Sequence, residues 1–290
     1  MALVTVITAT YNRAHTLPFL YESLRKQNKH LKWLVVDDGS TDGTEQVING
    51  FEKDELLDIC YIKKENGGKH TALNVGVREI DTPLTVIVDS DDTLLPNALD
   101  SIERIYDKYK NNKKIGFYTF LKCYSNGKPV VSLERDEFVE NYIDYRIKHE
   151  RPGDMAEVFL SDILKKYKFP EFPGEHFISE DIVWIEIGKH FDSVYINKSI
   201  YECEYLEGGL TANDKSMKFA SPLGSMMRGK QLMSVECGMK INIKGAIIYN
   251  CYQLQTDGKI PEALLLTARE RVLVILTKPI GRFFFNKWKK

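Results

Sequence analysis

Acidic side chains follow the apolar run at residues 84–88, in the order Asp89-Ser90-Asp91-Asp92. Hard cations such as Mg²⁺ and Mn²⁺ prefer oxygen ligands and are usually held by one or two carboxylates together with substrate phosphates. The spacing of Asp89 and Asp91 therefore suits a metal ion that is bound to a diphosphate. The alternative is a solvated turn in which Asp92 caps the next helix, but the position after a buried strand favours a ligand site.

A second acidic pair, Asp37-Asp38, ends the apolar run at residues 33–36. One helix cap cannot satisfy two adjacent carboxylates. A carboxylate at the end of a parallel strand can accept hydrogen bonds from a nucleotide base or from ribose hydroxyls. Asp38 is therefore a candidate for ligand recognition, whereas Ser40 and Asp42 are better explained as caps of the following helix.

Two glycines precede a lysine in the segment at residues 65–70. Gly67 and Gly68 allow the backbone to approach a ligand closely, and Lys69 brings a positive charge to the start of a helix, which favours phosphate. The spacing is not that of a P-loop, and an ordinary surface turn explains the same residues.

Ser179-Glu180-Asp181 begins a helix-like stretch, and Trp184 lies one turn further on. The helix dipole alone favours acids in a first helical turn. A carboxylate there could also act as a base, because removing the proton from an attacking sugar hydroxyl needs an ionised acid within hydrogen-bonding reach. The sequence by itself leaves both interpretations open.

The elements that must position these side chains alternate regularly as far as residue 109. Strands that are apolar throughout and separated by helices indicate a doubly wound, mostly parallel sheet covered on both faces. In such sheets ligands bind beyond the carboxyl ends of the strands, so the polar loops should meet at one edge. Strands are predicted at residues 3–9, 33–36, 57–62 and 84–88, and helices at residues 17–24, 42–51, 71–80 and 96–109.

The pattern loosens beyond residue 109. Residues 115–124 and 129–133 flank Ser125-Asn126-Gly127, which predicts a hairpin. Isoleucines at 178, 182 and 185 predict a helix at residues 178–187 with one buried face. Residues from about 215 onward predict mostly helix.

Composition and charge exclude several classes of protein. The 290 residues are 43% hydrophobic and 28% charged, and the mean hydropathy of -0.30 argues against an integral membrane protein. The 40 Lys and Arg against 41 Asp and Glu leave a net charge of -1, so we expect no nucleic-acid partner. Five scattered cysteines argue against a disulfide framework or a zinc site. The start of the chain does not read as a signal peptide, so we expect a cytoplasmic protein.

The C-terminal end differs in charge from the rest. The final 30 residues contain seven Lys and Arg and two Glu, a net charge of +5, against -6 for the preceding 260. Residues 282–290 interleave aromatic and cationic side chains, which suits a membrane interface carrying anionic lipids. We expect peripheral attachment to the inner face of the cell membrane through these residues. The alternative is that Phe283 to Phe285 pack on the rest of the protein.

Taken in order, these segments resemble the family 2 glycosyltransferases, which have the GT-A fold. Residues 4–13 are similar to that family's opening strand and nucleotide loop, and residues 35–44 to its acidic-pair strand. Residues 86–92 with Pro96 are similar to its Asp-x-Asp element, and Glu180-Asp181 to its late acidic pair. The resemblance covers about residues 3–205 and is most specific over residues 3–96.

The resemblance implies a reaction and a domain plan. A sugar would pass, with inversion, from a nucleotide diphosphate donor, most often a UDP-sugar, to a saccharide or lipid-linked glycan, as in bacterial surface-polysaccharide synthesis. The implied fold class is α/β: a GT-A, doubly wound, mostly parallel sheet with a mixed acceptor-side half and a helical C-terminal extension. Residues 1–114 would form the nucleotide-sugar-binding half, 115–212 the acceptor-binding half of the same domain, and 213–290 the helical extension with its basic aromatic tail.

The resemblance also implies roles for individual residues. Asp91 binds Mn²⁺ or Mg²⁺, Asp89 supports the ribose or the waters of the metal, and Asp181 is the catalytic base. The family often has arginine where this chain has Leu73, so we hypothesise that Lys69 supplies a positive charge toward the donor. The donor-binding candidates are Ala9 and Tyr11, which line the base pocket, Asp38, which meets the base, and Arg13, Asn66, Lys69, Asp89 and Ser90; the acceptor-side candidates are Glu180 and Trp184.

Two other classes of protein stay open. A catalytically silent sugar-nucleotide-binding or scaffold protein could share the fold, although Asp91 and Asp181 are both retained. A metal-dependent phosphohydrolase using Asp89 and Asp91 would carry its nucleophile on the first strand, which ends instead in Thr8-Ala9-Thr10.

Overall fold

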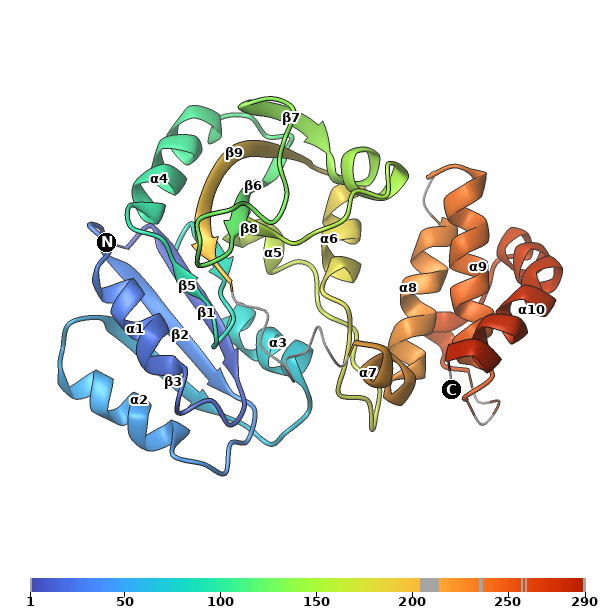
Figure 1. Cartoon of the computed structure of the whole chain (residues 1–290), viewed down its shortest axis with the longest axis horizontal. Coiled ribbons are helices and arrows are strands. Elements are labelled where there is room, and N and C mark those ends of the chain that lie inside the picture. The colour runs from blue at the N-terminus through green and yellow to red at the C-terminus, as the bar shows by residue number, and fades with distance from the viewer. Residues whose placement is uncertain (1, 204–213, 235–236, 257, 259, 289–290) are drawn as a thin grey trace. The chain divides into compact units, whose positions relative to one another are not determined.

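The structure, a computed structural model, describes residues 2–203, 214–234, 237–256, 258 and 260–288. The chain divides into two compact units (Figure 1). The first comprises Met1–Asn141, Pro152–Lys168 and His190–Glu204, and the second Tyr142–Arg151, Phe169–Lys189 and Tyr205–Lys290. The domain boundary expected at residues 212 and 213 lies outside the described residues.

The described part of the first unit is built on a nine-stranded sheet in the order β3-β2-β1-β4-β8-β6-β9-β5, with β7 paired to β9. Strands β3, β2, β1 and β4 are parallel, whereas β8 runs antiparallel to both β4 and β6. The doubly wound, mostly parallel half and the mixed half expected from the sequence are therefore confirmed. The strands are β1 Val4–Thr10, β2 Leu31–Asp37, β3 Asp58–Lys63, β4 Leu84–Ile87, β5 Thr93–Leu94, β6 Ile115–Cys123, β7 Glu137–Asn141, β8 Met155–Leu160 and β9 Asp192–Glu202.

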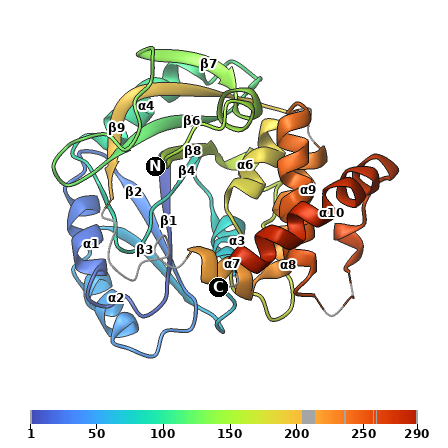
Figure 2. The same cartoon turned by 45° about the vertical axis from the view of Figure 1, so that its right-hand side comes forward.

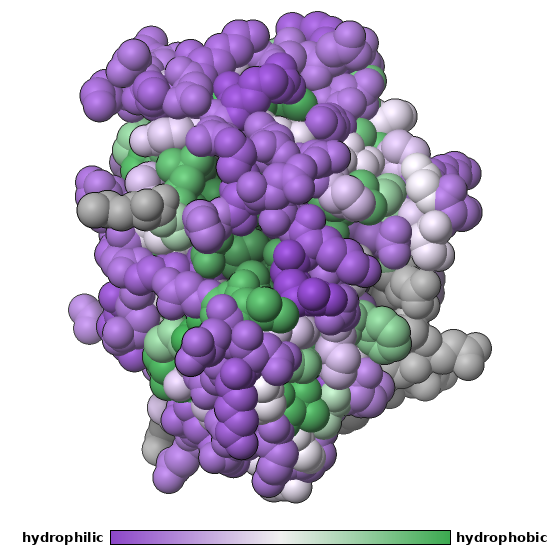
Figure 3. Space-filling model, turned by 90° about the vertical axis from the view of Figure 1, so that its left-hand side faces the viewer, coloured by the Kyte–Doolittle hydropathy of each residue, from purple (hydrophilic) through white to green (hydrophobic). Residues whose placement is uncertain are grey.

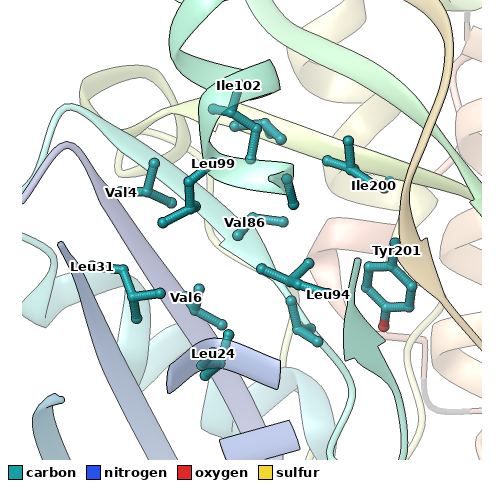
Figure 4. Packing of buried hydrophobic residues seen from close by; sticks show 14 of the residues in the cluster. Val4, Val6, Leu24, Leu31, Val86, Leu94, Leu99, Ile102, Ile200 and Tyr201 are labelled. Carbon is teal, nitrogen blue, oxygen red and sulfur yellow. The ribbon is translucent and has the colours of Figure 1, made fainter. Parts of the chain in front are cut away.

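Helices cover both faces of the parallel half, because its side chains alternate between the faces (Figures 1 and 2). On one face Val4 and Val6 pack with Leu24 and Leu99 in a buried cluster (Figure 4). On the other face Gly76 allows close approach, since a Cβ there would lie 3.0 Å from Ile7 Cγ2. The helices of this unit are α1 Leu17–Arg25, α2 Thr44–Lys53, α3 Lys69–Glu79, α4 Ala98–Tyr109 and α5 Ser161–Leu164.

Aromatic side chains join two of these helices to the sheet. Tyr21 of α1 stacks on Phe51 of α2 with ring centroids 4.0 Å apart, and Trp33 of β2 lies beneath both. The indole N–H of Trp33 donates to Thr8 Oγ1 at 3.0 Å, so its polar atom is satisfied inside the core. The face of the molecule in Figure 3 is mostly hydrophilic, with apolar residues in smaller patches.

The second unit is helical, as expected from residue 215 onward. Helices α8 and α9 cross where Gly229 and Gly245 meet, because a Cβ on Gly229 would lie 2.8 Å from the carbonyl oxygen of Gly245. Among the described residues, no helix combines the length and apolar character needed to cross a bilayer. The elements of this unit are a π-helix at Ile143–Lys148, α6 Asp181–Gly188, α7 Asp214–Ala220, α8 Pro222–Ser234, α9 Met239–Gln253, a 3₁₀ turn at Glu262–Leu264 and α10 Ala268–Trp288.

The predicted hairpin is only half correct. Its turn forms, with Tyr124 N–H donating to Lys128 O at 3.0 Å and Gly127 at a φ of 78°. The second arm forms only one bridge, between Cys123 and Pro129, beyond which the Val130 N–H still donates to Lys122 O at 2.9 Å. Strands β5, β7, β8 and β9, which complete the sheet, were not predicted.

Candidate functional site

The loops after β1 and β2 are tied together by Asn12. Its backbone N–H donates to Ser40 Oγ at 2.8 Å, and its side-chain Oδ1 accepts the N–H of Thr41 at 2.8 Å. Asn12 has a φ of 52°, a left-handed conformation that asparagine tolerates better than most residues. The two loops thus meet at the carboxyl edge of the sheet.

Asp38 organises the turn that precedes α3. Its carboxylate accepts the N–H groups of Gly67 at 3.0 Å and Gly68 at 2.7 Å, and it pairs with the ammonium of Lys64 at 2.7 Å. The Asn66 side chain donates to the carbonyl oxygen of Asp38 at 2.9 Å. Only 5% of the Asp38 side chain is exposed, so its carboxylate is held firmly within the loop. Recognition of a base by Asp38 stays a prediction.

The residues near Asp38 make hydrogen bonds that differ in part from the predicted helix caps. Asp37 accepts the Tyr61 hydroxyl at 2.6 Å and the Ser40 N–H at 2.7 Å. Asp42 accepts the N–H of Thr44, the first residue of α2, at 3.0 Å, and so satisfies a free N–H at the start of that helix, whose N-cap position is Gly43. The prediction for Ser40 was wrong, because its hydroxyl accepts the N–H of Asn12 instead.

The Asp89-Ser90-Asp91-Asp92 segment forms a turn closed by the Asp92 N–H on the carbonyl oxygen of Asp89 at 3.1 Å. Cations from two other loops reach it. Lys69, at the start of α3, forms an ion pair with Asp89, and Arg13, after β1, lies 3.8 Å from Asp91. The acidic turn and two of the predicted donor-binding cations therefore occupy one site.

Tyr201 of β9 stabilises this turn through two hydrogen bonds of its hydroxyl group. Its hydroxyl donates to Asp92 Oδ2 at 2.8 Å and accepts the N–H of Asp89 at 2.9 Å. The ammonium of Lys122, on β6, lies 4.1 Å from the centre of the Tyr201 ring. Sequence reasoning missed both residues, because no local pattern connects Tyr201 to an acid 109 positions earlier in the chain.

The charged side chains around the acidic turn alter one another's pKa values. Burial works to raise the pKa of Asp89, but the ammonium groups of Lys69 and Lys122 outweigh it and lower that pKa. Burial, and then the negative charge of Asp89, raise the pKa of Asp92 to about 7. Burial works to lower the pKa of Lys122, whereas Asp89 and Asp92 together raise it above its ordinary value.

The carboxylates of Asp89 and Asp91 suit a metal ion that a substrate also helps to bind. The side chains of Asp89 and Asp91 are 31% and 22% exposed, and both present hard oxygen atoms. No cluster of three or more His, Cys, Asp or Glu that could hold a metal occurs among the described residues. A Mg²⁺ or Mn²⁺ ion usually takes one or two carboxylates and completes its shell with phosphate and water, so these two residues match the chemistry of that group.

The remaining donor-side candidates lie on the same loops. Ala9 is half-buried near the end of β1, Tyr11 is exposed just beyond it, and Ser90 is buried within the acidic turn. A cavity of about 400 Å³ lined by Leu24, His30 and other residues lies at the amino ends of β2 and β3, and none of these candidates lines it.

Asp181 is the first residue of α6 and belongs to the second unit. It accepts the Ser179 hydroxyl at 2.6 Å and lies 2.5 Å from a guanidinium nitrogen of Arg228, on α8. Sequence reasoning missed Arg228. Glu180 immediately precedes the helix, while Trp184 is buried edge-on to Phe169 with ring centroids 5.9 Å apart. The acceptor-side roles of Glu180 and Trp184 stay predictions.

Comparison with known proteins decides the family. Residues 5–162, which include all but the first residue of β1, the acidic turn and β8, match the family described as Glycosyl transferase family 2. The chain belongs to this family. The resemblance carried by its opening strand and its acidic loops is confirmed.

A curated relative of this family 2 glycosyltransferase is the GalNAc(5)-diNAcBac-PP-undecaprenol beta-1,3-glucosyltransferase of Campylobacter jejuni. The two are 28% identical over 209 residues, which cover 69% of this chain and 63% of the relative. The chain spans only 28% and 35% of the length of two other curated glycosyltransferases that it matches.

Two solved structures share the fold of this glycosyltransferase. S. aureus TarS 1-349 in complex with UDP-GlcNAc aligns with a TM-score of 0.64 and 18% identity, covering 97% of this chain and 80% of that one. The mannosyltransferase PcManGT of Pyrobaculum calidifontis, in complex with GDP-Man and Mn²⁺, aligns with a TM-score of 0.59 and 16% identity, covering 99% and 84%. The expected GT-A fold class is confirmed.

Proposed function

We propose that this protein is an inverting, metal-dependent glycosyltransferase that moves a sugar from a nucleotide diphosphate donor, a UDP-sugar first among the candidates, to an acceptor hydroxyl. The observation that carries the proposal is the acidic turn at Asp89 to Asp92, set at the carboxyl edge of the sheet beside the cations Lys69 and Arg13. The complexes of its structural neighbours with UDP-GlcNAc and GDP-Man support a donor of this class.

The donor's diphosphate would contact both cations of this site, Lys69 and Arg13. Lys69 stands at the first residue of α3, where backbone N–H groups also favour an anion. Arg13 adds a guanidinium from the β1 loop, and guanidinium groups suit phosphate oxygens. Asp38 keeps Gly67 and Gly68 in the conformation that places Lys69 at this edge.

Asp91, with Asp89 beside it, would hold Mn²⁺ or Mg²⁺. When bound, the ion neutralises the negative charge that grows on the leaving nucleotide diphosphate, and so stabilises the transition state more than the ground state. Tyr201 and Lys122 hold the acidic turn in place through the contacts to Asp89 and Asp92 described above.

Asp181 is the proposed base. The acceptor oxygen forms a bond to the anomeric carbon as the bond to the diphosphate oxygen breaks, and that electron pair leaves with the nucleotide diphosphate. Asp181 takes the acceptor's proton, and attack from the face opposite the leaving group inverts the anomeric centre. Ser179 and Arg228 orient the carboxylate for this transfer.

The proposed acceptor is a saccharide or a lipid-linked glycan in surface-polysaccharide synthesis. The printed name of the Campylobacter relative, whose substrate is carried on undecaprenol, supports a lipid-linked acceptor. We assign donor binding to residues 1–114 and acceptor binding to residues 115–212. Peripheral attachment of the protein to a membrane is part of the same proposal.

Thermal-shift measurements against a panel of nucleotide sugars, with and without Mn²⁺, test donor binding, because a ligand that binds the native state raises apparent stability. Asp91→Ala is expected to lose the Mn²⁺-dependent part of the shift. Asp181→Asn should keep the shift and lose sugar transfer. Asp107→Asn, at an exposed acid on α4, is the matched control.

Three results would overturn parts of the proposal. Full transfer by Asp181→Asn removes the base assignment, and unchanged Mn²⁺ dependence in Asp91→Ala removes the metal site. Donor binding without turnover against any acceptor would instead favour a silent binding protein, and donor hydrolysis that needs no acceptor would favour a phosphohydrolase.

A further inference from the structure

Helix α10, Ala268–Trp288, has two faces of different character. One face packs within the second unit, where Asn250 of α9 donates to Val274 O at 2.7 Å and to Thr277 Oγ1 at 3.0 Å. Gly281 lets α10 approach α9 closely, since a Cβ there would lie 2.4 Å from Asn250 Cβ. This side of α10 is therefore packed against α9.

The opposite face of α10 is apolar and exposed. Its large side chains recur at spacings of three and four residues, as on one side of a helix. Ile275 and Leu276 are 69% and 70% exposed, far more than the buried Leu273 and Val274 next to them. We call this set the α10 stripe: Val272, Ile275, Leu276, Ile280 and Phe283.

The exposed charges that α10 itself carries beside the stripe are all positive. No Asp or Glu occurs from Arg271 to Trp288. The acid just before this segment, Glu270, is 4% exposed and occupied in the helix cap, where its carboxylate accepts the Thr267 N–H at 2.7 Å. The exposed cations on the helix are Arg269, Arg271, Lys278, Arg282 and Lys287.

We propose that the α10 stripe is a docking surface for a lipid membrane that contains anionic lipids. A helix with exposed large apolar residues and flanking Lys and Arg lies in the plane of the membrane interface, with its apolar side among the acyl chains and its cations at the headgroups. Negative headgroups match a segment that carries only positive charges. A second copy of the chain fits less well, because a symmetric contact through this face would bring like charges together.

The α10 stripe is centred on a different part of the helix from the tail at residues 282–290, to which the sequence composition assigned membrane attachment. Phe285 lies 6.3 Å from Phe219 between ring centroids, and Trp288 also packs against the core of the second unit. Lys289 and Lys290 lie outside the described residues. The docking surface is therefore centred earlier on the helix, at residues 272–283, and it does not depend on any donor or metal chemistry.

Co-sedimentation with vesicles tests this surface. The full chain, without donor or metal, is mixed with phosphatidylcholine vesicles and with phosphatidylcholine vesicles that contain phosphatidylglycerol. The double variant Ile275→Glu, Leu276→Glu replaces the most exposed apolar pair, and Lys278→Gln, Arg282→Gln removes two cations. Phe19→Glu is the matched control, because Phe19 is also 70% exposed but lies on α1 of the other unit.

We expect the wild type and Phe19→Glu to bind the anionic vesicles, with affinity that falls as salt is added. The Ile275, Leu276 variant should bind at least about tenfold more weakly, and the Lys278, Arg282 variant should lose its preference for the anionic vesicles. Both variants should keep the wild-type melting temperature and donor-induced thermal shift, because the altered side chains are exposed. That shift separates this test from the test of the glycosyltransferase proposal.

Several outcomes would overturn the proposal. These are wild-type protein that does not bind anionic vesicles, and an Ile275, Leu276 variant that binds as well as the wild type. A wild-type dimer that this variant converts to a monomer, with no vesicle binding, would assign the stripe to a second copy instead.

Discussion

The guanidinium of Arg228, on α8, lies 2.5 Å from the carboxylate of Asp181, at the start of α6. The two residues are far apart in the sequence, and only the packing of the second unit joins them. Ser179 holds the other oxygen of the same carboxylate at 2.6 Å. Both oxygens of the proposed base are therefore positioned, and this relationship leads to the first prediction.

Replacing Arg228 with Met should lower kcat for sugar transfer by about 10²-fold, because a displaced carboxylate loses the geometry of proton transfer. The Kd for the donor should change little, and Arg228→Lys should recover part of kcat. Steady-state kinetics and donor titration measure the two effects separately. Arg25→Met, which breaks an exposed pair with Glu22 on α1, is the control. An unchanged kcat in Arg228→Met would remove this positioning role.

Stability should fall as pH rises through the titration of Asp92. Its pKa in the folded protein is about 7, so between its ordinary value of 3.8 and 7 the native state binds the proton that the unfolded chain has released. Stability therefore declines with pH across this window, by about 2–3 kcal/mol from pH 5 to pH 8. Urea unfolding with a chelator present measures it.

Asp92→Asn is the control for that pH dependence, because its amide oxygen can still accept the hydroxyl of Tyr201. This variant should lose less stability between pH 5 and pH 8 than the wild type. An identical pH profile in both proteins would mean that Asp92 is not the group that titrates.

Replacing Lys69 with Ala should weaken UDP binding by about tenfold or more, since a hydrogen bond to a charged group contributes about 1.5–3 kcal/mol. Titration calorimetry at fixed Mn²⁺ measures the change. Lys63→Ala, which removes an exposed partner of Glu45, should bind UDP like the wild type. Equal affinity in the Lys69 variant would show that this cation serves only to hold Asp89.

Replacing Gly229 with Ala should destabilise the second unit by about 1–3 kcal/mol, because the new methyl group would collide with backbone atoms of α9. Gly50→Ala, at a helical glycine on α2 with open space around it, should instead raise stability by about 0.5–1 kcal/mol. Thermal unfolding followed by circular dichroism compares them. A melting temperature for Gly229→Ala at or above that of the wild type would contradict the tight crossing.

Much of the fold and part of the candidate site could be predicted from local pattern. The alternation of apolar runs and helical stripes predicted the parallel half to within a few residues, as at α1, where residues 17–24 became Leu17–Arg25. Strand β8 escaped prediction because its stability comes from antiparallel pairing with β4 and β6, which no local pattern encodes. The second arm of the hairpin was predicted but did not form a strand, because a local turn does not guarantee that the residues on either side of it pair in a ladder.

The sequence by itself determined the family and the position of the acidic loops, because strand and helix periodicity is local and the carboxyl ends of parallel strands share one edge. Only the tertiary structure decided which side chains surround those loops. Tyr201, Lys122 and Lys64 come from other strands or strand ends, and long-range packing selects them. It also decided which face of α10 is covered, because burial depends on what the folded chain places against a helix.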